Sequence, residues 1–518
     1  MSGLRPWLGF LAMCLGLFMA VLDVQVVASA LTAIGASLKV APERLGWIQT
    51  GYLMAEVIAI PLTGVLTRAF TLRWMFTVAT AGFTLASLGC ALATGLPTLI
   101  ALRILQGFFG GMLIPAVFTS VFVMMPPARQ TLATTLAGVF AVIAPTVGPL
   151  IGGYFTEHHS WRWIFLVNLP AGVVVSMVVA TCVRVGEPAL ASLRRIDHGG
   201  VALASLALAA LQLLLNEAPE HDWKGAYVAS IAAVTLISGV WAVARALGHA
   251  NPFVDLRRLS EPLYALGSSL SFVLGMGLYG SVYLLALFLG LVRGHSPLVI
   301  GEIMIVSGAA QLVTAPLAAW AETRVNSRLL ATAGFALFTA GLLTNAHATV
   351  ESDFWALFWP QVLRGAAVMF CLLPATRLAL GPVPSEQIPD ASALFNLMRN
   401  LGGAIGISLA ETLIETRTAG HARTLAEQLM KGDAEAARLV GVPADLLHAH
   451  TAQAARLAAG PGLEAIAPLV RRAALAQSFN EAWMLLGIAF CLSLAALLAA
   501  SVRLLREGTE ISRARPRA

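Results

Sequence analysis

The sequence predicts an all-α polytopic membrane protein with fourteen transmembrane helices, and its composition, its apolar runs and the placement of its charges support this. Of the 518 residues, 58% are hydrophobic and 12% are charged, about half the charge of a soluble domain. So few charges cannot cover several soluble domains, and intrinsic disorder requires low hydrophobicity. The apolar runs are long and unbroken, whereas a transmembrane β-barrel alternates over segments of about ten residues.

The apolar runs set the number of expected spans, because one helical crossing takes about 20 residues. The first run contains Asp23 and is too long for a cleaved signal peptide, so we expect it to remain as a span. The expected spans are 7–31, 45–66, 74–95, 97–123, 131–154, 163–183, 199–216, 226–246, 264–291, 298–320, 328–347, 354–376, 391–414 and 482–504.

Basic residues predict the orientation of the chain. The loops after spans 1, 3, 5, 7, 9 and 11 hold five of them: Lys39, Arg44, Arg162, Lys224 and Arg293. The opposite loops and the C-terminal tail hold seventeen. Because Lys and Arg accumulate on the cytoplasmic side, both termini are expected in the cytoplasm. The basic residues therefore report topology, and no nucleic-acid partner is expected.

A long polar, Ala-rich segment, 415–481, separates spans 13 and 14 and is expected outside the cytoplasm. Its pattern predicts one or two amphipathic helices, around 421–440 and 444–458. Two interpretations stay open for it: a solvated extracytoplasmic loop, or a docking surface for another protein.

Ionisable side chains inside spans are costly and mark functional sites. In the first half these are Asp23, Glu56 and Arg103, which we interpret as proton-coupling residues. A carboxylate in hydrocarbon can exchange a proton near neutral pH or attract a cationic substrate, and Arg103 can tune such a carboxylate. The alternative is a structural ion pair, such as Asp23 with Arg103, that fixes helix packing. Gln25 and Gln106 accompany them as substrate-cavity candidates.

The second half has its own polar positions within spans. We expect them to line the substrate cavity: Gln361, Arg364, Asn396, Arg399 and Glu411. Arg399 has two open interpretations: it binds an anionic substrate, or it caps a helix. For Glu411 the alternative to a cavity role is a position near the outer membrane interface without a role in transport. The spacing of Gln361, Arg364 and Gly365 partly repeats that of Arg103, Gln106 and Gly107, which indicates an internal repeat.

Proline and glycine are concentrated in span 5. Proline kinks a helix, and small residues let helices approach closely. The cluster therefore predicts either a hinge or static close packing, and consists of Pro145, Gly148, Pro149, Gly152 and Gly153.

Features of enzymes and cofactor proteins are scarce in the sequence. The five cysteines lie in apolar runs without a CxxC pair, the ten histidines form no HExxH motif, and the sequence has no GxSxG motif. We therefore expect no metal, no cofactor and no enzyme activity. A membrane-bound enzyme or a ligand sensor is the remote alternative to a transporter.

Six motifs in order along the chain carry a resemblance to a known family. Together they resemble the major facilitator superfamily, specifically the fourteen-span drug:proton antiporter-2 family of the EmrB/QacA type. The motifs lie at 22–27 (LDVQVV), 102–107 (LRILQG), 148–153 (GPLIGG), 161–172 (WRWIFLVNLPAG), 396–403 (NLMRNLGG) and 479–483 (FNEAW).

This resemblance implies an architecture and an activity. It implies six-helix bundles at 1–184 and 248–518, an inserted helix pair at 185–247, and a substrate site between the bundles. It implies proton-coupled export of lipophilic or amphipathic compounds by alternating access, in the bacterial inner membrane, with the proton as coupling ion. In Gram-negative relatives the partners are a periplasmic adaptor and an outer-membrane channel. The alternative is an exporter of one dedicated substrate: a fatty acid, siderophore or antibiotic.

The chain departs from the superfamily pattern G-x-L-A-D-R-x-G-R-K between spans 2 and 3. Thr67 stands for the Asp and Thr71 for the second Gly, while Arg68 is kept. The resemblance therefore leaves open whether a charge pair forms at this loop.

Overall fold

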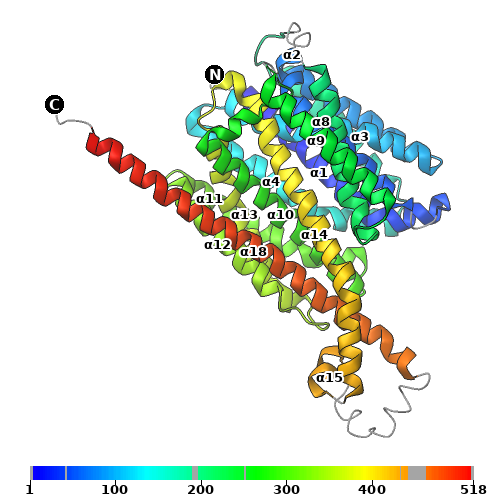
Figure 1. Ribbon diagram of the computed structural model, residues 1–518. Helices are drawn as coiled ribbons and strands as arrows, with labels where there is room; N and C mark the ends of the chain where they lie inside the picture. The colour runs from blue at the N-terminus through cyan, green and yellow to red at the C-terminus, as the bar shows by residue number, and fades with distance from the viewer. Residues whose placement is uncertain are drawn as a thin grey trace.

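The computed structural model describes residues 4–40, 44–189, 197–249, 252–431, 433–441 and 462–514. Within these ranges the regular elements are helices (Figure 1). The first half contains α1 (Leu4–Leu38), α2 (Gly46–Leu92), α3 (Leu96–Met124), α4 (Pro127–His158), α5 (Trp163–Leu166) and α6 (Asn168–Cys182). The middle hairpin contains α8 (His198–Glu220) and α9 (Ala226–Gly248). The second half contains η2 (Leu256–Ser260), α10 (Pro262–Leu287), η3 (Phe288–Val292), α11 (Pro297–Glu322), α12 (Ser327–Asn345), α13 (Phe354–Leu380), η4 (Ser385–Gln387), α14 (Ile388–Met430), α15 (Ala434–Val440) and α18 (Gly462–Ala514).

Local sequence explains where several helices begin. Proline occupies the first turn of α3, α4, α10, α11 and α14, where its missing N–H has no helical partner to lose. Asp197, Asn326 and Asp353 are N-cap residues whose side chains accept backbone N–H groups. These caps satisfy donors that a helix leaves free at its start.

The backbone breaks inside α2, at Thr71. Its φ of 70° and ψ of 155° are non-helical and belong to a region that only glycine adopts easily. The break divides α2 into two parts that correspond to predicted spans 2 and 3. The resembled family has glycine here, so the substitution places a β-branched residue in a strained conformation.

The described chain has 11 helices that are long and apolar enough to cross a membrane, or 12 if the bent pair within α4 counts as one span. These helices define a multi-pass membrane protein. Two predicted spans lie together in α2, and α14 fails this test because polar residues such as Asn396, Arg399 and Glu411 interrupt its apolar run. The total of fourteen spans stays a prediction.

The two halves meet mainly along α4 with α11 and α2 with α14, and α3 with α14 and α4 with α13 add further contacts. Helices α8 and α9 pack on each other, and α8 also contacts α2 and α14. The inserted hairpin therefore contacts both halves of the molecule. The boundaries at residues 184 and 247 stay predictions.

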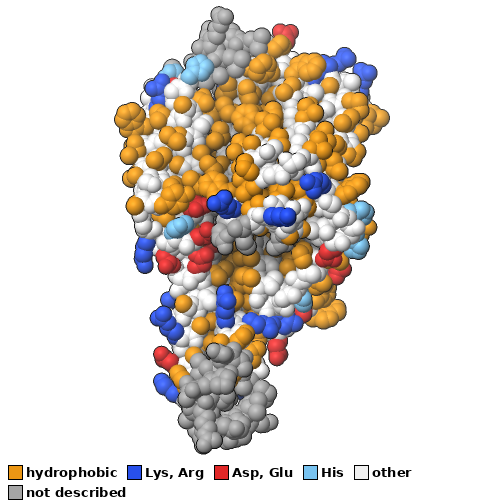
Figure 2. Space-filling view, turned by 90° about the vertical axis from the view of Figure 1, so that its right-hand side faces the viewer, with side chains coloured by type: hydrophobic (Ala, Val, Ile, Leu, Met, Phe, Trp, Pro, Cys, Tyr) orange, Lys and Arg blue, Asp and Glu red, His pale blue; other side chains and the backbone are white. Residues whose placement is uncertain are grey.

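The surface has the polarity that a bilayer requires. Hydrophobic side chains cover most of the upper part of the face in Figure 2, whereas charged side chains gather at its upper rim and in its lower part. A broad apolar surface of this kind is stable against lipid and is not expected of a monomer in water.

The segment 415–481 contains helix, as expected, but the two flanking span helices also continue into it, which the expected spans did not include. Helix α14 continues to Met430 and α18 begins at Gly462, and α15 lies between them. Figure 1 shows this protrusion at the end of the molecule opposite both termini. The helix expected at 421–440 is present as the end of α14 followed by α15, and the one expected at 444–458 lies outside the described residues.

Side-chain pairing explains why α14 and α18 stay helical beyond the expected spans. Thr418 donates to Ser478 Oγ at 3.0 Å, and the Glu481 carboxylate lies 3.0 Å from both Arg417 Nε and His421 Nε2. Further out, an apolar cluster joins α14, α15 and α18. Its members are Leu425, Ala436, Val440, Val470, Ala473 and Ala474.

Candidate transport site

Asp23 of α1 is the centre of a buried hydrogen-bond network in the first half. Arg103 and Gln106 lie one turn apart on α3, so both side chains reach the same point. Arg103 forms an ion pair with Asp23 Oδ2, and Gln106 Nε2 donates to Oδ1 at 3.0 Å. Asn168 Nδ2, from α6, also donates to Oδ1, at 2.9 Å. All four residues are at most 2% exposed, so the Asp23 charge is balanced within the protein.

A second set of contacts holds this network in place. Ser87 of α2 accepts from Gln106 and Asn168, each at 3.1 Å, and donates to the Phe165 carbonyl at 3.0 Å. The Arg103 guanidinium also lies 4.2 Å from the Tyr52 ring centroid. Breaking such a pair on one side leaves an uncompensated buried charge, so the arrangement resists local change.

Sequence reasoning identified Asp23, Arg103 and Gln106 but not Ser87 or Asn168. Asn168 is a polar residue in an otherwise apolar run and lies in the motif at 161–172, and these were its sequence signals. Ser87 carried no signal, because a lone serine in a transmembrane helix commonly bonds its own backbone.

Glu56 of α2 is buried, at 7% exposure, and differs from Asp23 in having no partner. Its carboxylate forms no hydrogen bond or ion pair with any residue that the structure describes. The charges of Asp23 and Arg103 act on it from one side, and Tyr279 of the second half is also near enough to interact. Glu56 is therefore within electrostatic range of both the Asp23 network and Tyr279 of the opposite half.

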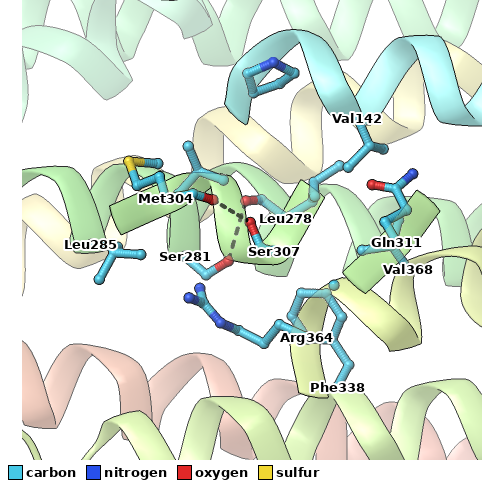
Figure 3. A pocket seen from close by; sticks show the side chains of 13 residues that line it. Val142, Leu278, Ser281, Leu285, Met304, Ser307, Gln311, Phe338, Arg364 and Val368 are labelled. Carbon is cyan, nitrogen blue, oxygen red and sulfur yellow. Dashed lines mark hydrogen bonds between the residues drawn. The ribbon is translucent and has the colours of Figure 1, made fainter. Parts of the chain in front are cut away.

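Arg364 of α13 lines a pocket between the halves (Figure 3). It is 4% exposed, and its Nε has no partner. It forms no ion pair within the described part of the chain. Gln361, one turn earlier, is fully buried with neither amide atom bonded. Ser281, Ser307 and Gln311, which also line the pocket, were not identified from the sequence.

The remaining cavity candidates do not gather around Arg364. On α14, Asn396 Nδ2 donates to the Ser392 carbonyl at 2.9 Å, and Glu411 accepts from the Tyr283 hydroxyl. Arg399 Nε is 3.3 Å from Ser271 Oγ. Its guanidinium also lies 5.1 Å from the ring centroids of Phe118, in the first half, and Phe395. Gln25 packs against Gly148 of α4. These side chains occupy separate environments, and Gln106 belongs to the Asp23 network.

The proline–glycine cluster of α4 lies between α1 and the second half. The two parts of α4, Pro127–Pro145 and Val147–His158, are bent by 42°. A Cβ added at Gly152 would lie 2.9 Å from the Val26 carbonyl oxygen, and one at Gly153 would lie 3.0 Å from the Leu298 nitrogen of α11. Pro149 is buried with them. The bend is thus combined with close packing on both sides.

An ion pair joins the halves near the break in α2. Arg68 pairs with Asp390 in the first turn of α14, and the absence of a side chain at Gly64 leaves room for Asp390. Ser392 Oγ donates to the Pro115 carbonyl of α3 at 2.9 Å. A charge pair therefore forms at this loop although Thr67 replaces the acidic residue of the superfamily pattern.

The hairpin of α8 and α9 bridges the halves at the other end, through Asn216 of α8 and Trp223 in the turn that follows it. Asn216 Nδ2 donates to Thr50 Oγ1 of α2 at 2.7 Å, and Trp223 Nε1 donates to Thr412 Oγ1 of α14 at 2.8 Å. The sequence did not predict these partners, because they depend on how distant helices pack.

Two packed halves, a buried carboxylate–guanidinium pair in one of them and a bent proline–glycine helix between them define the molecule as a secondary transporter. The sequence profile of the Major Facilitator Superfamily matches residues 13–407. The chain belongs to this superfamily, which confirms the prediction made from its motifs.

Two relatives and a solved structure agree with this assignment. The chain is 34% identical over 416 residues to the colistin resistance protein EmrB of Acinetobacter baumannii, covering 80% of this chain and 81% of the relative. It is 31% identical over 423 residues to the fatty acid resistance protein FarB of Neisseria gonorrhoeae, covering 81% and 83%. The proton:xylose symporter XylE has the same fold, with a TM-score of 0.59 at 14% identity over 82% of this chain and 91% of that chain.

Proposed function

We propose that this protein exports lipophilic or amphipathic compounds in exchange for protons, by alternating access across a bacterial cytoplasmic membrane. Its superfamily consists of transporters, and two relatives are named for resistance to different compounds, colistin and fatty acids. The excess of basic residues in alternate loops supports cytoplasmic termini. The protrusion formed by α14, α15 and α18 then lies outside the cytoplasm.

The observation that carries the proton coupling is the contrast between Glu56 and Asp23. Asp23 receives three donors, including the Arg103 guanidinium, so its carboxylate is paired within the protein. Glu56 is buried, and none of the described residues pairs with its carboxylate; an unpaired charge is more costly to bury than the neutral acid. In our proposal Glu56 takes up and releases the proton, and the Asp23–Arg103 pair senses that change.

The test is uptake into inverted membrane vesicles energised by an imposed pH gradient. The panel contains lipophilic cations, neutral drugs and fatty acids, and the variants are Glu56→Gln and Asp23→Asn. Both variants are expected to reduce gradient-driven uptake to background. The control is Glu386→Gln, which removes an exposed carboxylate of η4 and should leave uptake unchanged.

Each outcome of this experiment has a defined meaning. Uptake that survives an uncoupler would contradict proton coupling and indicate a facilitator. Uptake of a single chemical class would favour the dedicated exporter, of which a fatty-acid exporter is the form that FarB supports. Normal coupling in Glu56→Gln would leave Asp23 as the proton carrier.

We further propose that the protrusion contacts a periplasmic adaptor and, through it, an outer-membrane channel. Deleting residues 421–475 tests this, because Thr418 and Ser478 are hydrogen-bonded at 3.0 Å and a short Gly-Ser linker can rejoin α14 to α18 there. The deletion should abolish export from cells to the medium while preserving uptake into inverted vesicles. Unchanged export to the medium would contradict an adaptor contact at this site.

A further inference from the structure

The pocket around Arg364 is suited to hold a negative charge. We propose that it binds the carboxylate of an amphipathic substrate, so that this exporter selects organic acids over their neutral and cationic analogues. The inference rests on the proposed function, because it names a substrate class for the same transporter. It assigns the recognition of charge to the second half of the molecule.

The state of Arg364 is the first observation. A guanidinium stays protonated even inside a protein, and a buried charge requires a partner. Among the described residues, other deeply buried arginines have polar partners: Arg103 has Asp23, and Arg399 has Ser271. Arg364 has no ion pair or hydrogen bond of this kind, so a ligand is the natural source of its counter-charge.

Other polar side chains surround the guanidinium, but Arg364 is the charged donor of the pocket. The Ser281 and Ser307 hydroxyls donate to backbone carbonyls of their own helices, at 3.3 and 3.0 Å. Figure 3 shows Arg364 extending from α13 toward Ser281 of α10, with Ser307 and Gln311 of α11 on other parts of the wall. Gln311 Nε2 donates to the Gly138 carbonyl at 3.5 Å; its Oε1, which has no partner among the described residues, is an acceptor and does not bind the anion. No carboxylate is among the lining residues, so no negatively charged side chain there repels an anion.

The size of the pocket favours a small planar anion. Its volume is about 30 Å³, which is room for about two water-sized groups. A carboxylate has two oxygens in one plane and matches the two parallel N–H groups of a guanidinium. The rest of the wall is mainly apolar and includes Leu278, Leu285, Met304, Phe338 and Val368.

The position of the pocket explains how a larger substrate enters. Val142 and Pro145 of α4 form the wall contributed by the first half, and Pro145 lies where α4 bends. When the halves move apart, α4 withdraws from α10, α11 and α13 and uncovers Arg364. The apolar body of the substrate then lies between the halves, where close packing now leaves no room for it.

The test is equilibrium binding to the purified full-length protein in lipid nanodiscs without a pH gradient. Three probes share one body and differ in the head: radiolabelled 4-phenylbutyrate, 4-phenylbutanamide and 4-phenylbutylammonium. We expect the acid to bind at least about 10-fold more tightly than either analogue. The same preference is expected when the acid competes for gradient-driven uptake into inverted vesicles.

Four variants make the result specific to Arg364. Arg364→Gln should weaken acid binding about 10- to 100-fold and remove the preference, because it removes the charged bidentate donor. Arg364→Lys should keep the preference at reduced affinity, and it also serves as the second variant if Arg364→Gln folds poorly. The matched control is Arg377→Gln, on the same helix but half exposed and bonded to Glu322, which should bind like the wild type. Asp23→Asn should lose coupled uptake and still prefer the acid.

The outcomes separate this inference from the proposed function. Equal binding of the three probes, or an acid preference that survives Arg364→Gln, would overturn the carboxylate site even if coupled export is found. Acid-selective, Arg364-dependent binding without any coupled uptake would overturn the proposed export mechanism and support the site.

Discussion

Arg103 and Arg364 occupy corresponding helices of the two halves, but their surroundings differ. Each is close to a glycine that packs against a carbonyl oxygen of a neighbouring helix: Gly107 against Tyr52 and Gly365 against Ser307. Arg103 forms an ion pair with Asp23, whereas Arg364 has no acidic partner among the described residues. The helix packing is thus repeated in the second half, and the charge balance is not.

This difference indicates a division of labour between the halves. A complete buried ion pair makes the first half sensitive to any change of charge near it, as proton coupling requires. An unpaired guanidinium lowers the stability of the empty transporter and is compensated when an anion binds. Helix packing can therefore be shared by both halves while the charged groups take separate roles.

Neutralising Asp23 should have the largest effect on transport and stability, because it leaves the buried Arg103 without an acidic partner, as Arg364 is. Asp23→Asn is expected to reduce coupled uptake by at least about 100-fold and to lower stability by about 3–5 kcal/mol. The double variant Asp23→Asn/Arg103→Gln should recover much of this stability without recovering uptake. Thermal unfolding in detergent and vesicle uptake measure the two quantities. A double variant no more stable than Asp23→Asn would contradict the pairing.

The two glycines test the repeated packing. Gly107→Ala and Gly365→Ala should each destabilise the protein, by about 1–3 kcal/mol, because the added methyl group meets a backbone carbonyl. Thermal unfolding of both variants is compared with that of Gly239→Ala, whose Cβ would meet nothing within 4 Å. A large loss at one glycine and none at the other would show that the packing is not shared.

Neutralising Arg364 should change stability in the opposite direction from neutralising Arg103. Without ligand, Arg364→Gln is expected to be as stable as the wild type or up to about 2 kcal/mol more stable, because it removes an unpaired buried charge. Arg103→Gln should be clearly less stable, since it leaves Asp23 unpaired. Destabilisation of both variants in thermal unfolding would mean that Arg364 has a protein partner in solution.

The halves also differ at the loop after their second span. Thr71 has a φ of 70°, whereas Thr323, at the end of α11, has an ordinary φ of −82°. Thr71→Gly should therefore stabilise the protein by about 1 kcal/mol, and Thr323→Gly should not. Thermal unfolding of the two variants decides this, and equal effects would argue against strain at Thr71.

Breaking the partly exposed pair of Arg293 and Asp353 should have the smallest effect on stability. Arg293 Nη2 donates to Asp353 Oδ2 at 2.8 Å, and this hydrogen bond lowers the pKa of the Asp353 carboxyl below its usual value. The pair is partly exposed, so Asp353→Asn should cost no more than about 1 kcal/mol. The folded pKa is depressed, so the stabilisation is complete above the unfolded pKa and disappears as the pH falls through the folded one. Unfolding of wild type and Asp353→Asn from pH 7 down to pH 3 measures this, and a gap that widens in acid would contradict it.

The sequence predicted the class of fold and the family well, because hydropathy and local motifs determine both. It also singled out Asp23 and Arg103, since ionisable residues stand out in apolar runs. The structure brings these two residues into contact. They form the ion pair that was the alternative interpretation of them in the sequence.

Contacts that depend on distant segments could not be predicted. The partner of Arg68 is Asp390, more than 300 residues away, and nothing local marks that pairing. The Glu481 contacts that extend α14 and α18 also join remote positions. The lack of a partner at Arg364 and Glu56 was equally hidden, because a residue type does not reveal its neighbours.

Helix α14 can transmit leverage across the membrane. It runs without interruption for 43 residues from Ile388, near the ion pair with Arg68, to Met430 in the protrusion, a length of about 65 Å. For a rod of this length, each degree of tilt about Asp390 displaces the far tip by about 1 Å. A movement that separates the halves at one membrane face therefore also displaces the far end of α14 at the opposite face. Conversely, a protein bound to that end would oppose the movement.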